Sequence, residues 1–378
     1  MPRPEGSAGS GAPSVESVES IPDGEAAQID AITGSTLVQL DIRYRDGARK
    51  RRGVHAKGHG CASGTLRIES ELPETHRRGL FAQPGQEYAV TVRFSNAAVL
   101  DTDDSPHGDG SGPRQHGSRG LAVKVHGVAG DRLAEDGLDT QDFLAINQPV
   151  FAFANVQDYL TLSRALEQDT DRAASPAAFA ARVRDPATPA DERARLMASL
   201  GIIGRIQSVE ADGDPSPFQP PPASPVDNAY FGAAPFAFGA DQVMRFRLRP
   251  LAPGSEAPDI DDPDYLANAL RERLADDAAG PVAFAFEAQI RPAASLDPAT
   301  DIENAHQGWD EKEHTFHRLA ELTIPPQAID TEEATEACER LVFKPWIGLA
   351  AHRPLGGINR LRRPVYNASS DARGQANP

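Results

Sequence analysis

The feature that most constrains the fold is a series of seven short segments with the length and alternation of β-strands. In each, apolar residues recur at every second position or form a short run, which is typical of half-buried or buried strands. The segments are TLRIESEL (65–72), EYAVTVRFSNA (87–97), RGLAVKVHGV (119–128), QDFLAIN (141–147), QVMRFRLRPL (242–251), PVAFAFEAQI (281–290) and HRLAELTI (317–324). A chain with this many strands is expected to build an antiparallel β core.

Helical patterns are fewer and lie between the strands or after them. They are VQDYLTLSRALEQ (156–168), a pair of helices within 175–206 broken near Pro186 and Pro189, DPDYLANALRERLADD (262–277) and DTEEATEACERL (330–341). The last segment opens with acidic residues, which helix N-termini favour. Helices inserted into and appended to an antiparallel β core predict the α+β class.

The N-terminal segment differs in composition from the rest of the chain. Residues 1–36 are predicted to be a disordered N-terminal arm, because the segment is rich in Gly, Ser, Pro and Glu and almost lacks aromatic residues. Residues 37–378 are expected to form a single domain. Within it, the proline-rich segment DGDPSPFQPPPASPVDN (212–228) is predicted to be a surface linker.

Composition excludes several classes of partner. The 38 Lys and Arg residues against 55 Asp and Glu residues give a net charge of −17, and nucleic acid or an anionic membrane requires basic surface. Cys61 and Cys338 are the only cysteines, so no disulfide framework is expected. The N-terminus lacks the apolar core of a signal peptide, and no apolar run approaches membrane-spanning length. These features predict a soluble, cytoplasmic protein.

The segment RRGVHAKGHGCASGTL (51–66) places His55, His59 and Cys61 within seven positions. A metal site is one interpretation, although His-x3-His-x-Cys matches no structural zinc pattern. Solvated loop histidines are a second. A third makes His55 one wall of a pocket, because on an extended segment Arg52 and His55 leave opposite faces. The imidazole would then face one side while the guanidinium meets an anionic group elsewhere.

Polar residues in unexpected places support the pocket interpretation. Arg93 lies in an otherwise apolar strand, two residues before Ser95, and burial of a guanidinium is costly unless it meets a carboxylate. Asn147 lies among apolar residues, where its amide must be satisfied. Arg362 and Arg373 lie four residues before and seven residues after Tyr366, one and two helical turns away.

Taken in chain order, these segments resemble those of the heme catalase superfamily, in particular its short, minimal-core catalase-like and catalase-related peroxidase proteins. RGVHAKGHG is similar to the family's Arg-x-x-His-Ala-Lys-Gly segment, and VRFS to its Val-Arg-Phe-Ser. RGLAVKV resembles the strand that follows, and INQPVFAFANVQDY resembles the segment with the distal asparagine. INRLRRPVYNASSDARG resembles the family's Arg-x-x-x-Tyr with an arginine seven residues later. The resemblance covers residues 40–160 and the last thirty residues well.

The resemblance implies a catalase-like antiparallel β-barrel that encloses heme b, with inserted and C-terminal helices. It makes Tyr366 the axial ligand of the heme iron and Arg362 the cation that favours the tyrosinate form. It makes His55 the distal histidine, Ser95 the hydroxyl that hydrogen-bonds its imidazole, and Asn147 the distal amide. The implied chemistry is proton transfer by His55 between the two oxygens of a peroxide.

Further residues are implied as contacts of the cofactor. Arg52, Arg93 and Arg373 stand in the places of propionate-binding arginines, and Tyr159 in that of an aromatic residue packing on the porphyrin. Val54 precedes the histidine, as in true catalases, where the related allene oxide synthases have threonine.

Two departures from the larger catalases matter. Those proteins carry Asn-Asn-x-Pro, whereas this chain has Ile146 and Asn147, and adjacent strand residues face opposite sides. Asn147 is therefore expected to act through a bulge or a shifted register. The chain also ends twelve residues after Tyr366, which argues against bound NADPH and the interlocked tetramer, with a simpler homo-oligomer still open.

The resulting expectation is an oxidoreductase that consumes H2O2 or an organic hydroperoxide, with a small organic reductant as a further partner. Three alternatives stay open. One is a hydroperoxide isomerase of the allene oxide synthase type. The second is a non-heme metal hydrolase built on His55, His59 and Cys61. The third is a non-catalytic heme-binding protein.

Overall fold

The structure is a computed structural model that describes residues 14–44, 50–97, 104, 118–134, 138–167, 181–207, 224–254 and 262–374. Its strands are β1 (Gly58–Ile68), β2 (Glu87–Asn96), β3 (Arg119–Val125), β4 (Gln141–Ile146), β5 (Tyr230–Phe231), β6 (Phe236–Ala237), β7 (Gln242–Pro250), β8 (Val282–Pro292) and β9 (His317–Ile324). All seven predicted strands are present. β1 begins seven residues earlier than predicted, because GHGCASG carries no apolar alternation.

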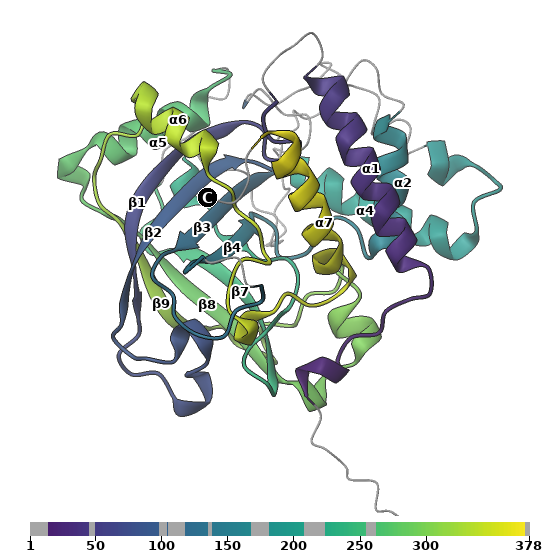
Figure 1. The fold of residues 1–378 in the computed structure, drawn as a ribbon, viewed down its shortest axis with the longest axis horizontal. Coiled ribbons are helices and arrows are strands. Elements are labelled where there is room, and N and C mark those ends of the chain that lie inside the picture. The colour runs from purple at the N-terminus through teal and green to yellow at the C-terminus, as the bar shows by residue number, and fades with distance from the viewer. Residues whose placement is uncertain are drawn as a thin grey trace, which may run out of the picture.

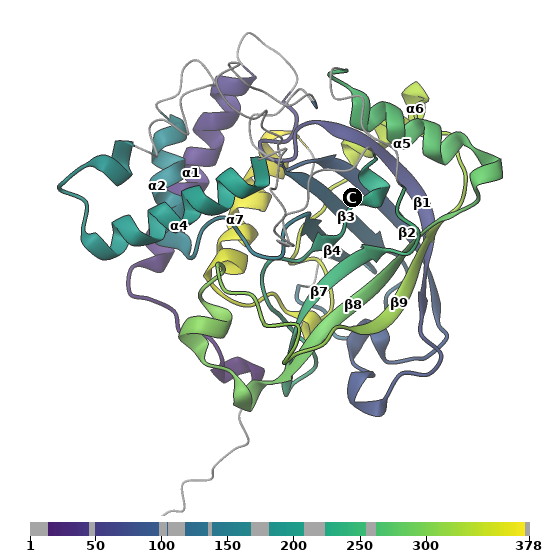
Figure 2. The same ribbon diagram turned by 180° about the vertical axis from the view of Figure 1, so that it is seen from behind.

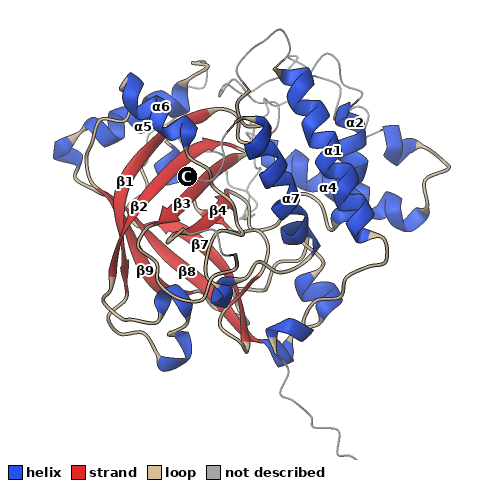
Figure 3. Cartoon of the chain, viewed as in Figure 1, coloured by secondary structure: helices blue, strands red, loops and turns tan. Residues whose placement is uncertain are grey.

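The described strands form one antiparallel sheet that closes on itself (Figures 1 and 3). Their order is β5-β4-β3-β2-β1-β9-β8-β7-β6, and a further pairing of β5 with β7 completes the ring. Closure rests on two short ladders, in which Ile146 pairs with Phe231 and Tyr230 pairs with Leu248. A closed barrel leaves few unpaired edges. The predicted antiparallel β-barrel of an α+β protein is confirmed.

Aromatic side chains fill the barrel interior. Phe143 lies 4.9 Å and Phe246 lies 5.3 Å from Phe286, measured between ring centroids, and all three are fully buried. Buried aromatic residues contribute the largest apolar areas to a core. The interior is therefore packed, and space for a ligand is expected at its ends or on its outer face.

The helices are α1 (Glu25–Arg43), α2 (Val156–Glu167), α4 (Ala190–Gln207), α5 (Tyr265–Ala275), α6 (Glu332–Arg340) and α7 (Gly357–Ala372). Short 3-10 helices span Val15–Ser17, Glu74–His76, Gly79–Phe81, Pro225–Asp227, Asp277–Ala279, Ala293–Ser295 and Ala350–His352, and Pro298–Ile302 forms a π-helical turn. Figures 1 and 2 place α1, α2, α4 and α7 together on one side of the barrel, whereas α5 and α6 lie against β1. None of the described helices has the length and apolar character needed to cross a membrane.

The prediction of a disordered arm over residues 1–36 is wrong for its described part. Helix α1 begins at Glu25, and the side chain of Ile32 is fully buried. Arg360 on α7 donates to Glu19 and Glu25 over 2.6 Å each. Average composition hides these few apolar and acidic residues, whose partners lie far away in the sequence: Ile32 packs on α2 and α7, and Arg360 is more than 300 positions from Glu19 and Glu25. Residues 1–13 lie outside the described residues.

The predicted linker 212–228 also differs from expectation. Residues 212–223 lie outside the described residues, but Pro225 and Val226 are buried in a 3-10 turn. The hydroxyl of Tyr230 donates to the carbonyl of Pro225 over 2.7 Å. The end of the segment is therefore part of the packed domain rather than a surface linker.

A disulfide joins Cys61 on β1 to Cys338 on α6, 277 residues apart. The expectation that no disulfide stabilises the fold is wrong. Two isolated cysteines give no spacing pattern, so only the fold reveals that they meet. The bond attaches α6 to the barrel wall, and the cytoplasmic location stays a prediction, since such bonds favour oxidising compartments.

Removing the bridge tests its contribution to stability. The Cys61→Ser, Cys338→Ser double variant is expected to lower the free energy of unfolding by about 2–5 kcal/mol, because the bridge restricts the unfolded chain. Urea unfolding of oxidised wild type, reduced wild type and the double variant measures the difference. The reduced wild type should match the double variant. Equal stability of all three proteins would contradict a stabilising role.

Candidate functional site

Four strand ends meet at one edge of the barrel. β1 begins there, β2 ends, β3 begins and β4 ends, and the register runs from Gly58 to Ser95, from Ser95 to Gly120 and from Gly120 to Ile146. His55 lies three residues before β1, and Asn147 follows β4 directly. The fold therefore brings His55, Ser95 and Asn147 to one edge.

The His55 ring lies against bare backbone. A Cβ atom at Gly120 would stand 2.3 Å from His55 Nδ1, so only glycine leaves room for the imidazole. The same nitrogen lies 3.2 Å from Ser95 Oγ. The backbone of His55 has a positive φ of 56°, a left-handed conformation in which histidine is enriched, and Arg93 donates to its carbonyl over 3.0 Å.

The segment before β1 is bent at residues 53–55. The segment is therefore not extended, and the expectation that strand alternation sends Arg52 and His55 to opposite faces is wrong. The two side chains still have different partners, because Arg52 faces α6 whereas His55 faces Ser95. The turn at His55, and not strand alternation, separates them.

His55 is held neutral. Withdrawal from water, followed by the positive charges of Arg93, Arg362 and Arg52 in that order, lowers the pKa of its imidazole to about 3. Nδ1 of this imidazole contacts the Ser95 hydroxyl, and in the neutral tautomer in which Nδ1–H donates to that hydroxyl, Nε2 is the atom that can take up a proton. The arrangement suits a proton acceptor that later returns the proton.

Asn147 extends the β3–β4 ladder by one pair. Its backbone N–H donates to the carbonyl of Arg119 over 3.0 Å, and its side-chain oxygen accepts from the Arg119 N–H over 2.7 Å and from Gln148 over 3.0 Å. The β3–β4 register runs without a shift to Ile146, so the expected bulge is wrong. Because the amide oxygen is occupied, the amide NH2 is the group that can donate to a ligand.

Three arginines gather around Glu339 of α6. Arg52 pairs with its carboxylate at 3.2 Å and Arg93 at 3.7 Å. Arg52 also donates to the carbonyl of Leu341 over 2.6 Å. Burial, and then the charge of Arg52, lower the pKa of Arg93 to about 9 and that of Arg373 to about 10. The guanidiniums thus lie close enough to repel one another.

This cluster holds more positive than negative charge. Among the described residues, three guanidiniums face the one carboxylate of Glu339, an excess of two positive charges. Among the described residues, Nε of Arg93 and Nε of Arg373 are buried without a hydrogen-bond partner. Buried guanidinium groups are normally paired, so the cluster fits a ligand with two negative charges.

Helix α7 carries Arg362 and Tyr366 on the spacing predicted, and Arg373 is the residue that caps its C-terminal end. The guanidinium carbon of Arg362 lies 5.5 Å from the centre of the Tyr366 ring, and Arg362 donates to the side-chain oxygen of Asn359 over 3.1 Å. Asn359 is fully buried and donates to the carbonyl of Pro235 over 2.9 Å. A fixed asparagine therefore orients Arg362 toward the tyrosine.

Tyr159 on α2 lies near Tyr366. It packs between Phe151 and Phe153, at 6.1 Å and 5.3 Å between ring centroids. Burial, and then the electrostatic influence of the neighbouring Tyr366 side chain, raise the pKa of Tyr159 to about 12. Tyr159 is therefore a neutral aromatic wall beside Tyr366.

The remaining predicted residue, Val54, directly precedes His55 and is half-buried. Two residues that shape the site lack a strong sequence signal. Glu339 lies in an acidic helix that looks like solvated surface, and Gly120 is one glycine among 32.

The metal interpretation of His55, His59 and Cys61 is wrong. Cys61 is bonded to Cys338 and offers no thiolate, and the described residues contain no group of three His, Cys, Asp or Glu side chains able to hold a metal ion. His59 is only 6% exposed, which also excludes a solvated loop histidine. It lies on β1 and contacts Asn96 at 3.2 Å.

His59 instead belongs to a separate buried polar network. Asn96 donates to Asp104 over 2.8 Å, and Arg119 donates to Asn96 over 3.2 Å. Asp104 pairs with Lys57 at 3.3 Å. These contacts join the start of β1 to the end of β2 and the start of β3, and so fix the edge that carries His55 and Ser95.

No family model matches the chain. Curated relatives include the catalase of Staphylococcus haemolyticus, 28% identical over 118 residues, and that of Staphylococcus epidermidis, 29% identical over 118 residues. Each alignment covers 31% of this chain and 20% of the relative, so the matched stretch spans only about a fifth of these catalases.

Solved structures extend the comparison to the whole fold. A bacterial catalase gives a TM-score of 0.58 at 16% identity, over 99% of this chain and 67% of that protein. A fungal catalase gives 0.57 at 15% identity, over 89% and 61%, and catalase A of Saccharomyces cerevisiae gives 0.57 at 14%, over 88% and 62%. The chain has the catalase fold, and the resemblance predicted from its motifs is confirmed.

The state of His55 can be measured directly. In the ligand-free protein with 13C-labelled histidine, the His55 ring signal is expected to stay in its neutral position from pH 8 down to pH 4.5. Because its folded pKa lies below the unfolded value near ~6.5, its contribution to stability is lost as the pH falls from about 6.5 to about 3. His55→Gln assigns the signal, and a midpoint near pH 6.5 would contradict the burial described here.

Proposed function

We propose that this chain, which has the fold of the catalases, is a heme-dependent peroxide-consuming oxidoreductase of the catalase or peroxidase type. The observation that carries the proposal is the excess of two positive charges around Glu339, at the same barrel edge as a neutral His55. A pocket with these two features suits a dianionic cofactor beside a proton-accepting group.

The residues present fit heme b. The two propionates of a heme would supply the two negative charges that Arg52, Arg93 and Arg373 lack. Tyr366 would hold the heme iron through its phenol oxygen, with Arg362 beside its ring stabilising negative charge on that oxygen. Tyr159 would contribute an aromatic wall. When bound, the heme would supply the redox chemistry that cleaves the O–O bond.

The chain's own residues would handle protons and orientation. His55 would accept a proton at Nε2 from one peroxide oxygen and return it to the other, so that water can leave. Ser95 would hold the tautomer that leaves Nε2 unprotonated. The NH2 group of Asn147 would donate a hydrogen bond to the departing oxygen, since its own oxygen is occupied by Arg119.

The proposal also covers which peroxide the enzyme consumes. H2O2 and organic hydroperoxides are both candidates, with a small organic reductant in the peroxidase reaction. We expect no bound NADPH, a cytoplasmic location and assembly as a homo-oligomer. Val54, in place of the threonine of allene oxide synthases, favours peroxide reduction over hydroperoxide isomerisation.

Heme attachment is tested on α7. Tyr366→Phe and Arg362→Ala are expected to lower heme content and weaken the Soret band, since each removes part of the axial ligand system. Arg363→Ala is the matched control, because Arg363 lies on the same helix with an exposed side chain over Trp346. Pyridine hemochrome assays measure the heme. Full heme content and turnover in both test variants would overturn the proposal.

Proton transfer is tested on His55. His55→Gln is expected to retain heme while peroxide consumption falls by about 10²–10⁴-fold, the usual contribution of a general acid–base group. His126→Gln, at the opposite end of β3, is the control. Oxygen evolution from H2O2 is measured beside turnover of an organic hydroperoxide with a reducing dye. A colourless wild type, or heme without turnover, would contradict the enzymatic role.

A further inference from the structure

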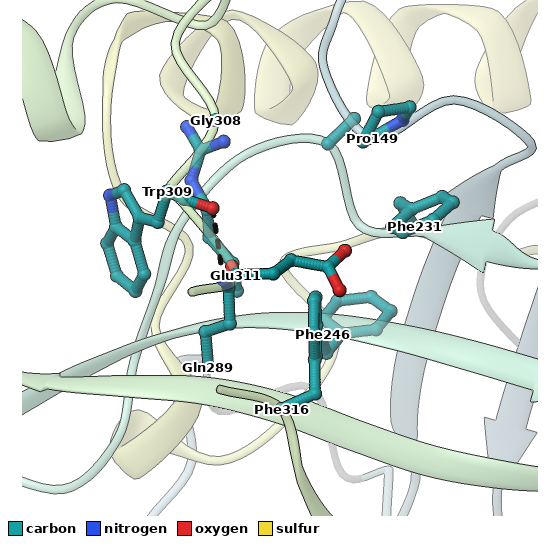
Figure 4. A pocket seen from close by; sticks show the side chains of 10 residues that line it. Pro149, Phe231, Phe246, Gln289, Gly308, Trp309, Glu311 and Phe316 are labelled. Atoms are coloured by element: carbon teal, nitrogen blue, oxygen red, sulfur yellow. Dashed lines mark hydrogen bonds between the residues drawn. The ribbon is translucent and has the colours of Figure 1, made fainter. Parts of the chain in front are cut away.

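A small, partly open pocket lies beside β7 and β8, apart from the residues assigned to the heme. Arg245 of β7 and Gln289 of β8 are cross-strand partners in its floor. The segment that carries Trp309 and Glu311 covers them, and Phe316 closes one side (Figure 4).

Arg245 lines this pocket with an unpaired charge. Arg245 is buried, with only 6% of its surface exposed. Among the described residues, its Nε, Nη1 and Nη2 atoms have no hydrogen-bond partner. Its guanidinium carbon lies 5.6 Å from the ring centre of Trp309, a cation–π contact that leaves every N–H unsatisfied. Burial lowers the pKa of Arg245 to about 10, which still leaves it charged at neutral pH.

The carboxylates near Arg245 already form ion pairs with other arginines. Asp301 pairs with Arg291 at 2.8 Å. Glu287 and Glu311 both pair with Arg247, at 2.7 Å and 3.2 Å. A buried guanidinium without an anion is costly. Among the described residues, therefore, no carboxylate pairs with the positive charge that Arg245 brings to the pocket.

The rest of the pocket defines the shape and charge of a partner. Pro149, Phe231, Phe246, Trp309 and Phe316 provide apolar and aromatic walls. Gln289 is held in place, since its NH2 donates to the carbonyls of Trp309 and His314 over 3.0 Å and 2.7 Å. Glu311 adds a negative charge to the lining, which disfavours a second anionic group on the ligand.

We propose that this pocket binds a small aromatic monocarboxylate, whose carboxylate pairs with Arg245 while its ring packs among the aromatic walls. Benzoate is the simplest member of this class. A planar carboxylate matches the fork of a guanidinium, which can donate two parallel hydrogen bonds. The single uncompensated charge accounts for one carboxylate, and the aromatic lining accounts for the ring.

The pocket also contacts the segment that carries the distal amide. Pro149 lies two residues after Asn147, and Phe231 pairs with Ile146 across the β4–β5 ladder. A bound aromatic acid would thus pack against Pro149, and against Phe231, whose backbone pairs with the residue before Asn147. The proposal itself concerns binding alone and does not rest on the proposed peroxide chemistry.

Calorimetry with benzoate tests the affinity. Benzoate is expected to bind the wild type with a dissociation constant below 1 mM, an affinity modest for a ligand of this size. Benzamide, which has the ring without the charge, and acetate, which has the charge without the ring, should each bind at least tenfold more weakly. Equal binding of benzamide, or no benzoate binding at 10 mM, would overturn the proposal.

Two variants on the outer face of β7 locate the contact. Arg245→Gln is expected to weaken benzoate binding at least tenfold. Arg249→Gln should leave it unchanged, because Arg249 is half-exposed and pairs with Glu287 at 2.6 Å. If Arg245→Gln does not fold, Arg245→Lys, which keeps the charge but loses the fork, serves instead and should still weaken binding. Equal effects of the Arg245 and Arg249 variants would contradict the assignment.

Fluorescence separates this pocket from the arginine cluster near His55. The chain has two tryptophans, so in Trp346→Phe the emission comes from Trp309. Benzoate is expected to change this emission saturably, with the same dissociation constant as calorimetry gives. If calorimetry detects benzoate binding but the emission of Trp309 does not change, benzoate binds elsewhere and the proposal is overturned. Heme binding is not needed for either readout, so failure of one proposal leaves the other testable.

Discussion

The site depends on the meeting of three arginine side chains at Glu339. Each guanidinium withdrawn from water costs several kcal/mol unless an anion compensates it, and Glu339 supplies one negative charge for three positive ones. The disulfide on the preceding residue, Cys338, fixes the end of α6 to β1. Barrel, α6 and the end of α7 thus contribute to one electrostatic arrangement, in which positive charge exceeds negative charge among the described residues.

The parts of this arrangement that lie on regular elements were predictable from sequence. Strand alternation identifies β2, so Arg93 and Ser95 fall on one face, and Ser95 does meet His55. Helical spacing places Arg362 one turn from Tyr366, and the two side chains are in contact. These predictions succeed because both the period of a strand and the period of a helix are local properties of the chain.

The parts that sequence reasoning missed depend on contacts between distant segments. Helix α1 owes its order to Arg360, and Cys61 finds Cys338 only because α6 packs on β1. His59 looked like a loop ligand, yet a bulge between Gly58 and Gly60 sets it within a strand, facing Asn96. No local pattern encodes such pairings. The uncompensated charge of Arg245 likewise appears only once its neighbours' partners are known.

The long separation between Cys61 and Cys338 also determines when their two segments can meet during synthesis of the chain. Arg52 and its partner Glu339 are 287 residues apart, so the barrel edge with His55 leaves the ribosome first. At about 5–20 residues per second, α6 and α7 follow on the order of tens of seconds later. During that interval the early arginines have no Glu339 and the early cysteine has no partner. The cluster of Arg52, Arg93, Arg373 and Glu339 is therefore assembled only after the last helix has been made.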